Sequence, residues 1–143
     1  MHTVPFSIKL LKAHRAQVNA IRPRMAEIGL SIGQPKVLDF LLRHEGCMQK
    51  ELAALCDIEP ATISRILDKM EAAGLISRTV AADNKRAVII HLTDLGRKKQ
   101  SEMMEIRREV EVDELRGFSP EEQEQFYRFL ERLYDNLTQE RDG

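Results

Sequence analysis

Residues 60–73 carry side chains whose types and spacing suit hydrogen bonding to a large polar partner. On a helix with about 100° per residue, the apolar residues that share one side are Ile63, Ile66, Leu67 and Met70. The residues on or beside the opposite side are Ala61, Thr62, Ser64, Arg65, Asp68 and Lys69. Small side chains let the helix approach closely, and the Arg65 guanidinium offers two parallel hydrogen bonds to a guanine edge. This face therefore has the chemistry to contact bases in a DNA major groove.

A solvated surface helix presents the same residue types, so the surrounding elements must decide between the two interpretations. A short helix is predicted over residues 49–55, and a tight turn separates it from the helix of residues 60–73. Two β-branched, apolar runs follow at residues 75–80 and 87–92, joined by a polar tip with Asn84, Lys85 and Arg86. This order is typical of a winged helix-turn-helix, in which one helix contacts the groove and the hairpin contacts the backbone.

Three motifs make the pattern more specific: ELA at residues 51–53, ATISRILDKMEAAGLISR at residues 61–78, and LTDLG at residues 92–96. Together with Arg86, they resemble the MarR family of bacterial transcriptional regulators, and the resemblance extends over nearly the whole chain. It implies a homodimer whose terminal helices interlock, with two winged lobes that reach successive major grooves of a pseudopalindromic operator. The DNA contacts that it implies are Thr62, Ser64, Arg65, Lys69 and Arg86, to which we add Asn84 and Lys85 at the tip.

Two residues depart from the family pattern. Met48 stands where the family often has Ser or Thr before the short helix, and a thioether cannot cap a helix as a hydroxyl does. Asn84 stands where an Asp commonly precedes the basic pair, with Asp83 one residue earlier. We therefore expect a helix of residues 49–55 without a side-chain cap and a different ion pairing at the tip of the wing.

The composition supports one mainly helical unit. The 143 residues are 43% hydrophobic and 31% charged with only 5% aromatic, which favours helices over a β-sandwich or barrel. We expect a single unit over residues 1–143, mainly α with a small two- or three-stranded β wing. Residues 31–92 would form the winged helix-turn-helix lobe, and residues 1–30 and 93–143 the N- and C-terminal dimerisation helices, whose apolar stripes exceed what the small lobe can cover.

Particular residues predict where helices begin, end and bury side chains. Pro23 is expected to kink or interrupt the first helix near residues 19–22, and Gly74 to end the helix of residues 60–73. Capping boxes are expected at Ser31 with Gln34 and at Ser119 with Glu122. The side chains expected to be buried on the second and last helices are Val37, Leu38, Leu41, Leu42, Phe126, Phe129, Leu130, Leu133 and Leu137.

The net charge of −1 is unevenly distributed. Residues 1–45 carry +4, residues 46–91 carry 0 and residues 92–143 carry −5, so the predicted lobe is not acidic. No apolar run approaches the roughly 18 residues that a membrane span needs, and residues 1–12 lack the features of a secretory signal. We expect a cytoplasmic protein of a bacterial or archaeal cell, with no membrane partner, cofactor or metal ion.

Cys47 and Cys56 support an alternative in which the chain is a thiol-based redox enzyme or an oxidant sensor. Neither belongs to a CxxC motif or has an adjacent basic residue, so we expect no enzymatic activity. A helix-turn-helix that serves only protein contacts is the other alternative. The resemblance also implies a small aromatic or phenolic effector, with His14 and Arg15 as candidate contacts, and we expect its binding to release a repressor from its operator.

Overall fold

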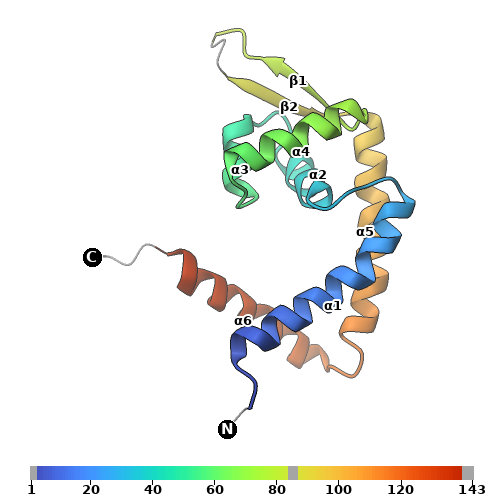
Figure 1. The fold of residues 1–143 in the computed structure, drawn as a ribbon, viewed down its shortest axis with the longest axis vertical. Helices are drawn as coiled ribbons and strands as arrows, with labels where there is room; N and C mark the ends of the chain where they lie inside the picture. The colour runs from blue at the N-terminus through green and yellow to red at the C-terminus, as the bar shows by residue number, and fades with distance from the viewer. Residues whose placement is uncertain (1–2, 84–86, 140–143) are drawn as a thin grey trace. The chain divides into compact units, whose positions relative to one another are not determined.

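The computed structural model describes residues 3–83 and 87–139, so the predicted wing contacts Asn84, Lys85 and Arg86 lie outside the described residues. In chain order, the elements are α1 (Phe6–Glu27), α2 (Gln34–Arg43), α3 (Gln49–Leu55), α4 (Pro60–Ala72), β1 (Ile76–Val80), β2 (Val88–Leu92), α5 (Asp94–Glu114) and α6 (Pro120–Thr138) (Figure 1). The chain divides into two compact units, Met1–Val110 and Glu111–Gly143. The prediction of a mainly helical fold with a β wing is confirmed.

The wing is a two-stranded antiparallel hairpin. β1 pairs with β2 in a register that runs from Ile76 opposite Leu92 to Val80 opposite Val88. Such a hairpin is marginal alone, and Figure 1 shows α2, α3 and α4 gathered beside it. Met48 extends the pairing by one isolated bridge to Ile89, directly before α3. This bridge attaches the hairpin to the start of α3, and the helices in turn support the strands.

The core of the first unit forms where the apolar sides of these helices meet. Every third or fourth residue of α4 is apolar, and Ile63, Leu67 and Met70 are at most 1% exposed. They pack with fully buried residues of the neighbouring elements, among them Val37, Leu38, Leu41, Leu52 and Ile90. Because the inner side of α4 is fixed in this core, its other side has to face outward.

The start of α2 differs from the predicted capping box. The residue before α2 is Gly33 with φ of 90°, and no side chain caps the helix. The Gln34 side chain accepts a hydrogen bond from the Ser31 backbone nitrogen at 3.0 Å, which is half of the predicted box. The Gln34 backbone nitrogen instead donates to the Ser31 carbonyl at 3.1 Å, because the loop turns once more before the helix begins.

Side-chain hydroxyls lie at the starts of both α5 and α6. The Thr93 hydroxyl accepts a hydrogen bond from the Gly96 nitrogen at 3.0 Å and donates to the Gly74 carbonyl at 2.6 Å, which connects α5 to the end of α4. Gly74 has a φ of 78°, as expected of a residue that ends a helix. At α6, the capping box of Ser119 and Glu122 is complete, with hydrogen bonds of 3.1 and 2.9 Å.

Three expectations about the helices were not met as stated. Pro23 does not interrupt α1, which continues through it, since one missing backbone donor does not have to end a helix whose other bonds remain. Leu42 is 40% exposed on α2. No residue of α6 is buried: Leu133 is half-buried, and the exposed members of the predicted set are Phe126, Phe129, Leu130 and Leu137. The described part of the unit Glu111–Gly143 consists of the end of α5, a turn and α6, so no further layer within that part covers this face.

Candidate nucleic-acid interface

The outward side of α4 carries the polar residues that the sequence placed there. Arg65 and Lys69 are exposed, while Thr62 and Ser64 are half-buried. Neither Arg65 nor Lys69 forms an ion pair with any described residue, so both cations are available to a ligand. The four side chains therefore lie on one helix, as predicted, and the positive charges of Arg65 and Lys69 have no ion-pair partner among the described residues.

Arg78 on β1 joins the wing to α4. Its guanidinium donates to the Asp68 carboxylate at 2.6 Å and to the Glu71 carboxylate at 3.1 Å. These hydrogen bonds, to Glu71 and then to Asp68, raise the pKa of Arg78 above its ordinary value. The contact offsets two negative charges beside the basic residues of α4 and connects the helix to β1. This contact was not predicted from the sequence, although acidic residues three apart on a helix, followed by an Arg on the next strand, are a recognisable pattern.

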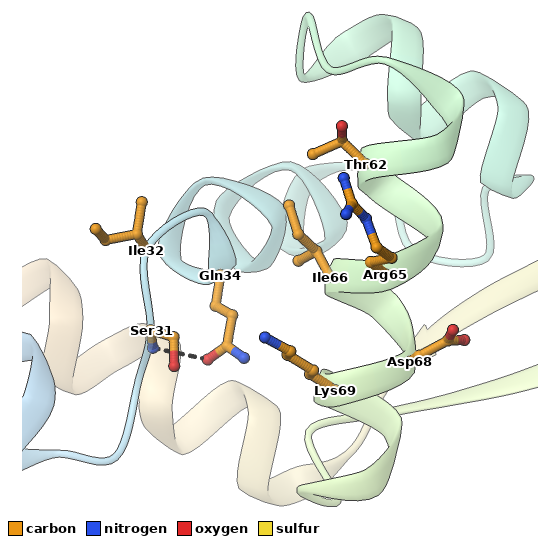
Figure 2. Close-up of a pocket in the computed structure, with 8 residues that line it drawn as sticks. All are labelled: Ser31, Ile32, Gln34, Thr62, Arg65, Ile66, Asp68 and Lys69. Carbon is orange, nitrogen blue, oxygen red and sulfur yellow. Dashed lines mark hydrogen bonds between the residues drawn. The ribbon is translucent and has the colours of Figure 1, made fainter.

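A cavity of about 440 Å³ lies between the loop that leads into α2 and the outward side of α4. Figure 2 shows Ser31, Ile32 and Gln34 on one wall and the α4 residues on the other. Arg65 extends along α4 toward Thr62, whereas Lys69 extends across the cavity toward the loop. Asp68 points to the other side of the helix, where Arg78 binds it. Ser31 and Gln34 were assigned only to a cap by sequence, so their part in this surface was not foreseen.

Comparison with known proteins places this lobe in a family. Residues 28–87 match the model of the MarR family. The winged-helix lobe is that of the MarR family. The predicted resemblance is thereby confirmed, on the same stretch that carries α4, the helix-turn-helix and β1.

Solved structures extend the match to the fold of nearly the whole chain. The transcriptional regulator SlyA superimposes with a TM-score of 0.86 at 23% identity, covering 94% of each chain. The Staphylococcus aureus MepR–DNA complex superimposes with a TM-score of 0.86 at 24% sequence identity, and the match covers 93% of this chain and 98% of MepR. The DNA binding of Bordetella bronchiseptica BpsR is regulated by 6-hydroxynicotinic acid. BpsR superimposes with a TM-score of 0.81 at 21% sequence identity, and the match covers 90% of this chain and 98% of BpsR. The chain thus has the fold of MarR-family transcriptional regulators.

The remaining predicted residues lie apart from α4. His14 and Arg15 are exposed on α1, and neither lines the cavity beside α4.

Among the described residues, no three or more His, Cys, Asp or Glu side chains form a group that could hold a metal ion. No helix in the described part of the chain is long and apolar enough to cross a bilayer.

Both cysteines of the MarR-family lobe are free and buried, on either side of α3. Burial raises the pKa of Cys47, and it raises the pKa of Cys56 to about 11. A thiol reacts through its thiolate, so a raised pKa lowers the reactivity that an oxidant sensor or thiol enzyme needs. In the folded chain these residues have the environment of small apolar side chains.

We therefore expect Cys56 to resist alkylation in the folded protein. With a pKa of about 11 instead of 9.0, its thiolate fraction at about pH 8 falls roughly a hundredfold. Iodoacetamide labelling followed by mass spectrometry should give a rate below about one hundredth of the rate in urea, rising roughly tenfold per pH unit between about pH 7 and 9. If Cys56 is alkylated at equal rates in the folded and unfolded chains, its thiol is not buried. Cys56 would then remain a candidate for oxidant sensing.

Proposed function

We propose that this chain is a sequence-specific DNA-binding transcriptional regulator and not an enzyme. The observation that carries the proposal is the placement of Arg65 on the exposed side of α4, within a winged helix-turn-helix lobe of the MarR family. A core on the inner side and Arg78 on the wing side hold this helix, so its outer face is presented in one orientation. In the proposed complex, Arg65 contacts a base edge in the major groove, and the tip of the wing contacts the backbone.

The regulator acts as a homodimer in this proposal. α6 presents large apolar side chains to solvent, including Phe129 at 58% and Leu137 at 80% exposed, and α1 does the same with Phe6 at 70% and Leu11 at 51%. Exposed apolar side chains of this size on two helices are typical of a surface that another chain covers. A second copy would cover them, and twofold symmetry would then require a pseudopalindromic operator.

Repression and release by an effector complete the proposal. A small aromatic or phenolic anion is the proposed effector, and His14 or Arg15 on α1 is its proposed contact. The support is that the structurally similar BpsR is regulated by 6-hydroxynicotinic acid, an aromatic acid. The chain would act in the cytoplasm, where bacterial and archaeal DNA lies.

Selection from a random pool of duplex DNA tests this function directly. The expected result is enrichment of a pseudopalindrome with half-sites about 10 base pairs apart, because a dimer places two recognition helices one helical turn apart. Binding should weaken steeply as salt rises, since phosphate contacts release counterions. The proposal would be contradicted if the selected pool is indistinguishable from the input and the protein binds no duplex in low salt. That result would favour the alternative of a helix-turn-helix that serves only protein contacts. Enrichment of single half-sites would contradict the homodimer alone.

A further inference from the structure

The cavity beside α4 contains a buried amide whose donor has no acceptor. Gln34 is only 5% exposed, and its Oε1 accepts the hydrogen bond from the Ser31 backbone nitrogen. This bond fixes the orientation of the amide, so that Nε2 is the atom turned into the cavity (Figure 2). Nε2 has no acceptor among the described residues. Since every fully buried polar side-chain atom in that part of the chain has a partner, Nε2 must be reachable from the cavity.

A cation meets this amide from the opposite wall. Lys69 lines the same cavity, and Figure 2 shows its ammonium and the Gln34 amide nitrogen pointing toward one another. Two donors do not bind each other, and the acidic residue that lines the cavity, Asp68, is bound by Arg78 on the other side of α4. Water can satisfy both donors in the free protein, and a negatively charged acceptor that replaces this water would suit the pair best.

The geometry of the two walls is held by close packing. A Cβ at Gly33 would lie 3.0 Å from Ile66 Cδ1, so the loop before α2 sits directly against α4. The left-handed φ of Gly33 turns the chain into α2 at this contact, and the first turn of α2 adds a favourable dipole for an anion. Ile32 and Ile66 give the cavity apolar sides. The backbone segments that carry the two donors are thus held against each other, and the Gln34 amide is fixed by its hydrogen bond to Ser31.

We propose that this cavity binds a phosphate of the DNA backbone, beside the groove that α4 enters. Gln34 Nε2 and Lys69 Nζ would donate to the two non-bridging oxygens, and Ile32 would lie against the sugar carbons. The proposal rests on the proposed DNA-binding function, because the cavity opens on the same side of α4 as Arg65. Phosphate contacts of this kind fix the register of a recognition helix and carry no sequence preference.

The test uses Gln34→Glu in the full chain. The glutamate retains an oxygen for the Ser31 nitrogen but replaces the amide donor by a second acceptor, so the hydrogen bond to Ser31 remains while the anion contact is lost. We expect about tenfold weaker binding on selected and random duplexes alike, and a fall of about one unit in the slope of log affinity against log salt. Fluorescence anisotropy across a salt series measures both quantities. Gln17→Glu, on the exposed side of α1, is the control for the change of one charge, and urea unfolding checks that each variant is folded.

A second variant asks whether the two donors hold one phosphate. Lys69→Met should lower the slope by a similar amount, and the double variant should lose less than the sum of the single losses, because one shared contact is removed twice. Strict additivity would overturn the shared site. Wild-type affinity and slope in folded Gln34→Glu would overturn the proposal while DNA binding by the wild type stands. Failure of the wild type to bind any duplex would overturn the proposed function and this inference together.

A free anion is the competing occupant, and inorganic phosphate is its probe. If phosphate raises the unfolding temperature of the wild type but not of Gln34→Glu, while the variant binds DNA as the wild type does, the cavity is a small-anion site and the proposal is wrong. If the variant loses DNA affinity as expected, a weak protection by inorganic phosphate agrees with a site built for a phosphodiester.

Discussion

Arg65→Ala should weaken binding to the selected operator by about 1–3 kcal/mol while changing binding to random duplexes far less. The reason is that a bidentate contact to a base edge is lost only where the correct base is present. Arg65 forms no ion pair with any described residue, and it is exposed, so its removal leaves no buried charge behind. Competition anisotropy with operator variants, each changed at one base pair, would show reduced discrimination at a single position of each half-site.

The control for this experiment is Arg43→Ala. Arg43 is also exposed and lies in the last turn of α2, so the variant removes the same charge from the same lobe without changing α4. It should alter operator binding only through the modest loss of a surface charge. If Arg65→Ala weakens operator and random duplex equally, Arg65 contacts a phosphate, and the base-reading role belongs to another residue of α4.

The largest expected effect on folding comes from Gly96→Ala. A Cβ at this position would lie 2.1 Å from the Leu75 carbonyl oxygen and 3.1 Å from Leu92 Cδ2. The first atom is backbone next to β1 and cannot move aside without disturbing the hairpin, so α5 itself must shift. We expect the free energy of unfolding to fall by about 3 kcal/mol, the upper part of the range for overpacked sites. Urea unfolding followed by circular dichroism measures the change.

Ser101→Ala provides the comparison on the same helix. Ser101 is exposed and lies further along α5, so its replacement should stay within about 0.5 kcal/mol of the wild type. Together the two variants separate close packing at the start of α5 from any general effect of alanine on this helix. A Gly96→Ala protein as stable as the wild type would show that α5 and Leu75 approach less closely than the structure has them.

The local pattern of residues was enough to predict the elements and the outward face of α4. Ile63, Leu67 and Met70 recur at helical spacing, so any helix here has to bury that side, and Arg65 must then face away from the core. Gly74, and Ser119 with Glu122, mark helix ends because their backbone and side-chain preferences act within a few residues. The order of the helix-turn-helix and hairpin follows from these local preferences.

Only the tertiary structure decided which distant residues meet. The sequence assigned Gln34 to a cap, and the fold turned its other amide atom toward Lys69, 35 positions away along the chain. Likewise, Arg78 reaches Asp68 and Glu71 because β1 returns beside α4. On α6, four of the five apolar residues predicted to be buried are exposed and Leu133 is half-buried, since periodicity reports that a face is apolar and not what covers it. Local sequence determines helices and faces, whereas contacts between faces depend on loop geometry and packing over long separations, which no short pattern encodes.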